Sequence, residues 1–234
     1  MKKSILIAAA VMLAAVSHGQ MFAQLFGQTW TPASLSPVAW YRGEGNALNS
    51  AGTTNASWVT SGEAYSTGIG QCFDFTNNNG TVGYITCNAS LLPETNNFTL
   101  AYWVYTTATD EQIMAAQYLL GDAKRMLLSI RPTTMLIGVQ INTRYDTTLA
   151  ITPSAWNHIT IVRQYPNFSV YKNGVLVETF AKTDGIIQTE PTTLAAFGTS
   201  NALFPFRGKL DEVIVVRRAL TQSEITQLYN WRQP

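Results

Sequence analysis

Residues 206–230 read "FRGKLDEVIVVRRALTQSEITQLYN", and they carry the strongest structural signals in the chain. The apolar run Val213–Val216 has no polar alternation, which predicts a strand that is covered on both faces. Thr221 is followed three residues later by Glu224, which matches a capping box, where each side chain satisfies a free backbone N–H at a helix start. Apolar residues then recur at helical spacing. The stretch therefore predicts a buried closing strand followed by one short amphipathic helix.

The chain before this stretch predicts many short strands. In FSVYKNGVLVETF, residues 168–180, the pair Asn173-Gly174 lies between two alternating arms, and both residues tolerate the positive φ of a type I′ hairpin turn. Segments 98–107 and 156–165 are rich in aromatic and β-branched residues, which favour strands. Turn-forming residues separate such runs at short intervals, and no long helical period precedes residue 221. The pattern predicts an all-β antiparallel sandwich.

The first 36 residues are expected to lie outside this sandwich. Lys2 and Lys3 precede the apolar run ILIAAAVMLAAV and the small and polar residues SHGQ, which is typical of a secretory signal peptide over residues 1–19. The apolar run is shorter than the roughly 20 residues that a membrane-spanning helix needs, and an uncleaved N-terminal anchor is the alternative. Residues 20–36 are interpreted as an N-terminal arm or linker, and residues 37–232 as one domain.

The mature chain is expected to be nearly neutral. Loss of the two leader lysines changes the formal net charge from +1 to −1, and only 12% of all residues are charged. Nucleic acids and anionic membranes are bound by clustered Lys and Arg, which this chain lacks. We therefore expect no nucleic-acid partner. Because no stretch after the leader has the length and apolar character of a membrane span, we also expect no membrane insertion of the mature chain.

Cys72 and Cys87 are the only cysteines in the sequence. In an exported protein, two cysteines favour a single disulfide. If FDF and GYI form the arms of a hairpin around NNNGT, the two cysteines face each other across the ladder. The sequence predicts a Cys72–Cys87 disulfide on this basis, and two buried free thiols are the alternative.

Five stretches, in their order and spacing, resemble the laminin-G-like domains of the concanavalin A-like lectin/glucanase superfamily. They are VAWYRGEGNALNSAG, GQCFDFTNNNGTVGYITC, FTLAYWVYT, WNHITIVRQYPNFSVYKNGVLVET and the closing stretch quoted above. The resemblance covers residues 37–230. It implies a jelly roll of two antiparallel sheets packed face to face, one convex and one concave.

The resemblance also implies a structural calcium ion at the rim of the domain, with Glu44, Asn49 and Asp211 at the matching positions. Calcium takes six to eight oxygen ligands, commonly including carboxylates. Where family members usually carry aspartate in the first loop, this chain has Glu44 and the neutral Asn49, so a weaker or empty site is one alternative. The other is that Asp211 accepts hydrogen bonds from the backbone of the GEGNALN turn without an ion.

The acidic pair Asp211-Glu212 is not expected to perform catalysis. Some relatives of this fold are glycosidases with catalytic carboxylates at alternating positions of one strand, and retaining cleavage needs two carboxyl groups about 5–5.5 Å apart. Neighbouring strand residues point to opposite faces, so neither this pair nor Asp110-Glu111 is expected to flank one bond. His158 lies within a strand segment and is interpreted as structural. The sequence therefore predicts no enzyme activity.

Two segments offer groups that suit a carbohydrate ligand, which is held by aromatic stacking and by polar hydrogen-bonding groups. The candidate binding residues are Asn142, Arg144, Tyr145 and Asp146 in NTRYDTT, and Phe204 and Arg207 in SNALFPFRG. The alternative for Tyr145 and Phe204 is that they cover the edge of the core.

The first functional hypothesis is a secreted or cell-surface recognition module without catalytic activity, most simply carbohydrate-binding or adhesive. Its partner is then a glycan or an extracellular protein. The second hypothesis is a structural surface or virion component that acts through packing against other proteins. A glycoside hydrolase is the third.

Overall fold

The structure is a computed structural model. It describes residues 30–59, 63–76, 83–94, 96–118, 124–186, 188–197 and 204–233. The signal peptide expected over residues 1–19 and the first part of the expected arm, residues 20–29, lie outside the described residues. Within the described ranges, no helix has both the length and the apolar character needed to cross a membrane.

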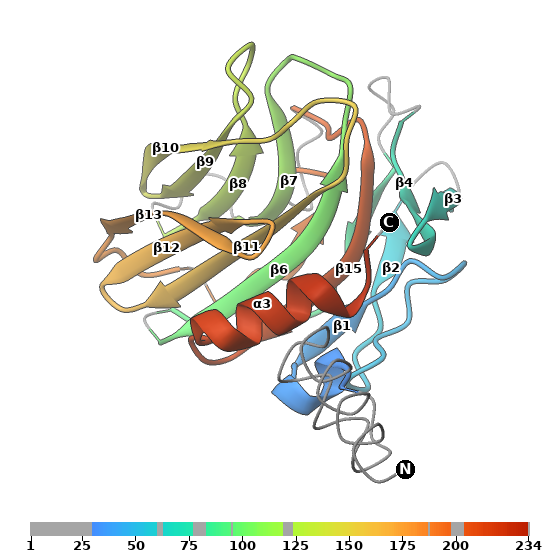
Figure 1. Cartoon of the computed structure of the whole chain (residues 1–234), viewed down its shortest axis with the longest axis horizontal. Coiled ribbons are helices and arrows are strands. Elements are labelled where there is room, and N and C mark those ends of the chain that lie inside the picture. Colours follow the sequence, from blue (N-terminus) through green and yellow to red (C-terminus); the bar gives the residue numbers. More distant parts are fainter. Residues whose placement is uncertain are drawn as a thin grey trace, which may run out of the picture.

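Two antiparallel sheets pack face to face (Figure 1). Sheet A has the order β13 (Val175–Ala181), β12 (Asn167–Lys172), β11 (Asn157–Gln164), β6 (Phe98–Tyr105), β15 (Lys209–Val216), β4 (Gly70–Asp74) and β3 (Tyr65–Gly68), and β1 (Ala39–Tyr41) also pairs with β15. Sheet B has the order β10 (Thr143–Ala150), β9 (Leu136–Ile141), β8 (Met126–Ile130), β7 (Gln112–Gln117), β14 (Thr192–Leu194), β5 (Tyr84–Thr86) and β2 (Ser57–Val59). The predicted sandwich is confirmed.

The closing strand β15 is covered on both faces, as its unbroken apolar run predicts. Val213 and Val215 belong to the main core between the sheets. Ile214 and Val216 belong to a second apolar cluster on the outer face of sheet A, together with buried residues of the helix α3 (Gln222–Trp231). Figure 1 shows α3 lying across the lower part of sheet A. The closing segment therefore covers one face of the sandwich and leaves sheet B free of helices in the described part of the chain.

The predicted helix cap is present at the start of α3. The Thr221 hydroxyl accepts a hydrogen bond from the Glu224 backbone N–H, and Glu224 Oε2 accepts one from the Thr221 backbone N–H at 2.8 Å. Arg218 adds two hydrogen bonds to the same carboxylate, at 2.9 and 2.6 Å. These contacts fix the point where the chain leaves β15 and turns back over sheet A.

The predicted hairpin turn between β12 and β13 is also present. Lys172 pairs with Val175, which leaves Asn173 and Gly174 as the two turn residues. Their φ angles are 51° and 78°, so both are positive, as a type I′ turn requires.

The hairpin expected to join the two cysteines is wrong. Cys72 lies in β4 of sheet A, whereas Cys87 follows β5 of sheet B, and these strands do not pair with each other. Cys87 belongs to the core between the sheets, while Cys72 alternates with the core residue Phe73 and so points away from that core. Both are buried free cysteines. The cross-strand pairing that supported a disulfide is absent because the segment between them crosses from one sheet to the other.

Residues 30–36, interpreted from the sequence as part of an arm, pack against the domain. The short 3-10 helix η1 (Pro32–Leu35) inserts Leu35 into the cluster beneath α3, where it is 3% exposed. Two segments near the ends of the described chain, η1 and α3, thus cover the outer face of sheet A together.

Candidate functional site

Four charged side chains form a closed network on the outer face of sheet B. Glu111 precedes β7, Arg131 follows β8, and Arg144 and Asp146 lie in β10. Arg131 and Arg144 each contact both carboxylates, and the distances are 3.3 Å for Arg131 to Asp146, 3.3 Å for Arg144 to Glu111 and 3.2 Å for Arg144 to Asp146. Arg131 also forms an ion pair with Glu111. We call these four residues the charged network; two arginines and two carboxylates give it no net charge.

The floor under the charged network is made of small residues. Ser129, Gly138 and Asp146 are paired across β8, β9 and β10. A Cβ atom at Gly138 would lie 2.5 Å from Ser129 Oγ and 3.2 Å from Asp146 Oδ1. Glycine in the interior of a strand often marks a position where another group approaches closely. Here it allows the Asp146 carboxylate to lie against the sheet, within reach of both arginines.

Aromatic residues lie beside the network on the same sheet. Phe204 is 42% exposed and is held next to β7, because its carbonyl accepts a hydrogen bond from the Ile113 N–H at 2.9 Å. Its ring is 6.2 Å from that of Phe197, which is 4.5 Å from the ring of Tyr118. The Arg125 guanidinium lies over Tyr118 at 5.8 Å. The outer face of sheet B thus combines accessible charged groups with an accessible aromatic ring.

The structure separates the four candidates of NTRYDTT. This segment is strand β10 and not a loop, so its side chains alternate between faces. Arg144 and Asp146 point to the outer face, where they join the network. Tyr145 points inward, stacks on Phe180 at 4.1 Å and donates a hydrogen bond from its hydroxyl to Glu178. Asn142 is the turn residue between β9 and β10, with a φ of 56°.

The other two candidates lie apart from each other. Phe204 is on the outer face of sheet B, as described above, whereas Arg207 forms an ion pair with Asp110 at the rim of the sandwich. Glu111 and Arg131 are members of the network that the sequence analysis missed. Glu111 lies just before β7 and Arg131 just after β8, and only the pairing of these strands with β9 and β10 brings them to Arg144 and Asp146.

The second charged site is the acidic pair of the closing strand, and the expectation that its members point to opposite faces is wrong. Leu210 and Val213 both pack in the core. The register of β15 against β6 shifts between Asp211 and Ile214, and Glu212 has a φ of 48°. This is a β-bulge, in which two residues occupy the place of one. It turns both carboxylates toward the outer face of sheet A.

Glu212 is neutralised by arginines from both ends of the domain. Its side chain is nearly buried, and its Oε1 lies 3.5 Å from Arg42 Nε and 3.1 Å from Arg232 Nη1. The Trp40 indole N–H donates to its Oε2. Burial raises the pKa of Glu212, while Trp40 and the two arginines oppose that rise. Arg232 also pairs with Glu44 at 3.0 Å, so it ties the residues after α3 to the first loop.

Asp211 is fully buried beneath the turn between β3 and β4. Its Oδ2 accepts a hydrogen bond from the Ile69 N–H at 2.8 Å, and its Oδ1 accepts one from the Glu212 N–H at 2.8 Å. Burial raises the pKa of Asp211 to about 8, and the negative charges of Glu212 and Glu44 add to that effect. Asp211 therefore holds a proton at neutral pH, which removes one negative charge from the cluster.

The three expected calcium ligands do not fit a calcium site. Asn49 Oδ1 accepts hydrogen bonds from the Trp40 and Ala51 N–H groups, and both oxygens of Asp211 already accept backbone N–H groups. Glu44 faces Arg232 and the Gln71 N–H. Across the described residues, no three His, Cys, Asp or Glu side chains are grouped as a metal site. Arginine side chains occupy the place where a cation would have to approach Glu44 and Glu212.

His158 is packed away from solvent under α3. It is 3% exposed, with its ring 5.1 Å from Trp103 and 5.9 Å from Tyr229. Burial lowers the pKa of His158 to about 3, so the ring is neutral at physiological pH. It packs as an aromatic residue and has no access to a substrate.

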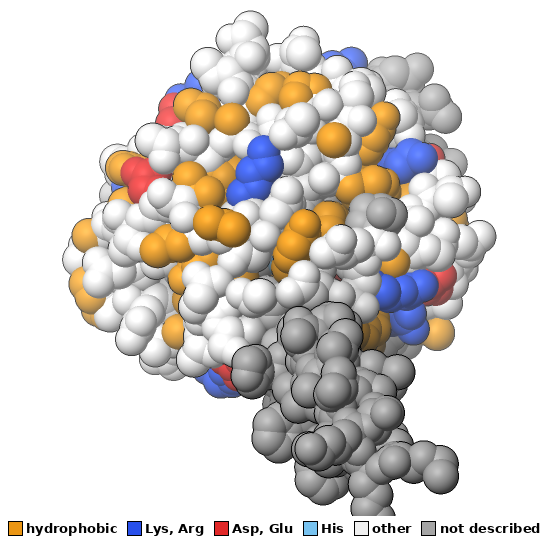
Figure 2. All heavy atoms as spheres, viewed as in Figure 1, with side chains coloured by type: hydrophobic (Ala, Val, Ile, Leu, Met, Phe, Trp, Pro, Cys, Tyr) orange, Lys and Arg blue, Asp and Glu red, His pale blue; other side chains and the backbone are white. Residues whose placement is uncertain are grey.

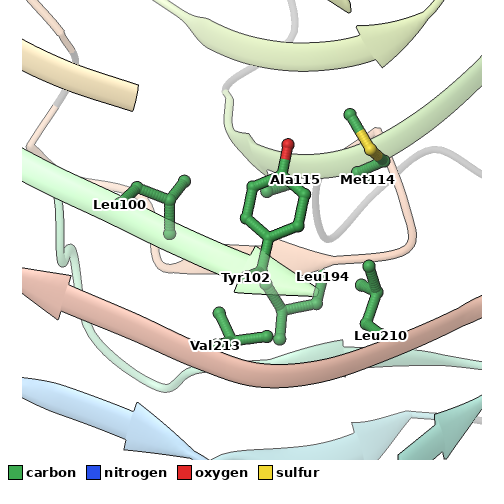
Figure 3. Close-up of a pocket in the computed structure, with 7 residues that line it drawn as sticks. All are labelled: Leu100, Tyr102, Met114, Ala115, Leu194, Leu210 and Val213. Atoms are coloured by element: carbon green, nitrogen blue, oxygen red, sulfur yellow. The ribbon is translucent and has the colours of Figure 1, made fainter. Parts of the chain in front are cut away.

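A small cavity lies between the sheets (Figure 3). Seven residues line it: Leu100, Tyr102, Met114, Ala115, Leu194, Leu210 and Val213. Its volume of about 10 Å³ is close to the minimum that one water molecule needs. The Tyr102 hydroxyl is buried there without a hydrogen-bond partner, and burial raises the pKa of Tyr102. This cavity is too small to hold a saccharide.

Comparison with known proteins agrees with this fold. Residues 78–226 match the family model of the concanavalin A-like lectin/glucanases superfamily. No curated protein matches the sequence. Among solved structures, the chain is similar to domain 4 of AbnA, a GH43 extracellular arabinanase from Geobacillus stearothermophilus, in complex with arabinotriose. The TM-score is 0.68 at 19% identity, over 83% of this chain and 98% of that chain.

Two toxin structures are also similar. The binding domain of Paraclostridial Mosquitocidal Protein 1 gives a TM-score of 0.64 at 18% identity, over 85% of this chain and 52% of that chain. A structure of botulinum neurotoxin type C gives 0.65 at 12% identity, over 86% and 52%. This chain therefore spans about half the length of the toxin chains. It belongs to the concanavalin A-like lectin/glucanases superfamily, as its resemblance to laminin-G-like domains implies.

Proposed function

We propose that the protein is a secreted, non-catalytic recognition module that binds carbohydrate on the outer face of sheet B. The charged network is the observation that carries this proposal. Its arginines donate and its carboxylates accept, so it offers both partners that sugar hydroxyl groups need. The side chains of Arg144 and Asp146 are 39% and 41% exposed, which leaves them accessible to a ligand.

The position of the network on the sandwich supports a binding role. α3 and η1 cover the outer face of sheet A, whereas the network lies on the opposite sheet, where the paired strands β7 to β10 fix the positions of its members. Exposed ion pairs contribute only about 0–1 kcal/mol each to stability. The ion pair between the exposed side chains of Arg144 and Asp146 therefore adds little to stability, and both side chains can exchange it for contacts with a ligand.

Two of the similar structures support the same class of ligand. Domain 4 of AbnA is in complex with arabinotriose, and cell entry of botulinum neurotoxin type C is dependent upon interaction with two ganglioside molecules. The proposed lack of catalysis is supported by the surroundings of the carboxylates, which are held by arginines or buried away from a substrate. Glu111 and Asp146 are each held by two arginines, and Asp211 and Glu212 are buried.

The proposal is tested with a panel of arabinotriose, cellotriose, laminaritriose, maltotriose and a ganglioside oligosaccharide, using isothermal titration calorimetry. Hydrogen bonds to charged groups contribute about 1.5–3 kcal/mol, so Arg144→Ala and Asp146→Asn should each weaken binding by about tenfold or more. Lys124→Ala is the matched control, because Lys124 and Glu94 form an exposed ion pair outside the network. If no saccharide of the panel binds, or if the network variants bind as the wild type does, the proposal is wrong.

A second function is favoured by one observation on the edge strand of sheet A. Val175, Leu176 and Val177 are consecutive in the edge strand β13 and are 66%, 47% and 40% exposed. Exposed apolar edge strands are templates for pairing with another chain. A structural surface component that packs through β13 would elute as an oligomer from a sizing column, and Leu176→Lys would convert it to a monomer.

A further inference from the structure

A row of four side chains lies on the outer face of sheet A, beyond the reach of α3. It consists of Trp156 just before β11, Tyr105 at the end of β6, Lys209 at the start of β15 and Asp74 at the end of β4. Lys209 pairs with both Tyr105 and Asp74, so these three are neighbours across the sheet. The rings of Tyr105 and Trp156 are 5.7 Å apart at 52°. We call these four residues the aromatic row.

The aromatic row points away from the core. The strand neighbours Val104, Leu210 and Phe73 all belong to the core between the sheets. Because successive side chains on a strand alternate, the row must lie on the other face. Tyr105, Lys209 and Asp74 fall on three adjacent strands about 4.8 Å apart, so they span about 10 Å, and Trp156 extends the row further.

The neighbouring side chains on the same face of sheet A are buried under α3, so the helix covers the sheet up to this point. Trp103 and His158 lie two residues along the same strands, and both rings pack against Tyr229 of α3. They are 4% and 3% exposed, whereas all four members of the aromatic row are partly exposed. In Figure 1 the upper ends of β6 and β15 extend past α3, and Figure 2 shows hydrophobic and basic side chains interspersed on this face.

The Lys209 ammonium group and the Asp74 carboxylate are both able to form hydrogen bonds with a bound ligand. Among the lysines in the described ranges, Lys209 alone has an ammonium group without a hydrogen bond or ion pair, and its contact is with the Tyr105 ring at 6.0 Å. Asp74 is oriented through its Oδ1, which accepts the Thr76 N–H at 2.9 Å. Although burial opposes it, hydrogen bonds from Ser66 and Thr76 and the positive charge of Lys209 lower the pKa of Asp74, so its carboxylate is ionised at neutral pH.

We propose that the aromatic row is a second saccharide-binding site, on the opposite side of the sandwich from the charged network. The Tyr105 and Trp156 rings stack on the C–H face of a sugar, while Lys209 donates to its hydroxyl groups and Asp74 accepts from them. One cation and one anion favour an uncharged oligosaccharide over a phosphate-bearing ligand, which needs clustered cations. The inference rests on the proposed function for its class of ligand, and it makes the domain bivalent.

The test uses the full domain, the same saccharide panel and two pairs of variants. Tyr105→Ala with Trp156→Ala removes the stacking platform, and Lys209→Ala with Asp74→Asn keeps the platform but removes the polar groups. Either pair should weaken one class of sites by about tenfold and leave one site per chain. Saturation should also quench or shift the Trp156 fluorescence, and this signal should disappear in Trp156→Ala.

The outcomes separate the two proposals. Loss of one of two sites in the row variants, with the other lost in Arg144→Ala, supports both. Binding that is lost only in Arg144→Ala and unchanged in Lys209→Ala with Asp74→Asn overturns the second site and leaves the proposed function intact. Binding that is lost only in the row variants supports the second site and overturns the role of the charged network. If the wild type binds no saccharide of the panel, both are wrong.

Discussion

The buried position of Asp211 predicts an unusual dependence of stability on pH. Burial raises its pKa from 3.8 to about 8 in the folded state. In the unfolded chain the carboxyl group ionises near pH 4. Between these values the folded state binds one proton more than the unfolded state, so the free energy of unfolding must fall as pH rises from about 4 to 8. The stabilising contribution is complete below pH 4 and lost above pH 8.

The size of the effect follows from the same values. Each pKa unit corresponds to about 1.4 kcal/mol, so complete ionisation in the folded state removes on the order of 6 kcal/mol. Asp211→Asn removes the titrating group. Its amide nitrogen would face one of the two N–H donors, from Ile69 or Glu212, so the variant should be about 1–3 kcal/mol less stable than the wild type at pH 5.

The assay is urea denaturation of both proteins at several pH values from 5 to 8.5. The difference in unfolding free energy between the wild type and Asp211→Asn should shrink or reverse as pH rises, because only the wild type has a carboxyl group at residue 211 that ionises. His158 has the opposite sign. Its pKa is lowered to about 3 when folded, so its contribution falls as pH drops below 6.5. That contribution is present in both proteins and cancels in the difference. Parallel pH profiles would show that Asp211 is ionised in the folded state.

Three further predictions follow from other buried groups. Tyr102→Phe removes a buried hydroxyl without a partner and should raise the unfolding free energy by about 1–3 kcal/mol; a lower melting temperature would show that the hydroxyl is hydrogen-bonded in solution. Thiol titration of the unreduced, unfolded protein should give two equivalents, from Cys72 and Cys87, whereas none would establish a disulfide. Millimolar calcium should leave the melting temperature at its value in chelator, because the oxygens of Asp211 are occupied; a rise that Asp211→Asn abolishes would restore the calcium site.

Local signals in the sequence were sufficient for the elements that local contacts determine. The type I′ turn at Asn173-Gly174 depends on two residues that tolerate positive φ. The cap of α3 depends on Thr221 and Glu224, which lie three residues apart. The unbroken apolar run of β15 indicates that this strand is buried on both faces. Each of these features is encoded within a few residues, so it can be read before any tertiary contact is known.

The candidate sites depend on contacts that such signals do not contain. The charged network joins Glu111 and Arg131 to β10 through the pairing of four strands, and strand pairing sets which distant residues meet. The bulge at Glu212 shifts the alternation by one residue, so both closing carboxylates share a face. Cys72 lies in a strand of sheet A and Cys87 follows a strand of sheet B, because the chain between them changes sheets.

The sequence by itself determined the class of fold, the closing helix and the strongest hairpin, because hydrophobic period and turn chemistry act over short stretches of chain. Only the tertiary structure decided which charged groups meet and which are buried. Side-chain direction on a strand follows a period of two, so one extra residue reverses it. The tertiary structure therefore paired Glu44 with Arg232, placed backbone N–H groups on the oxygens of Asn49 and Asp211, and brought Arg144 and Asp146 together on the outer face of sheet B.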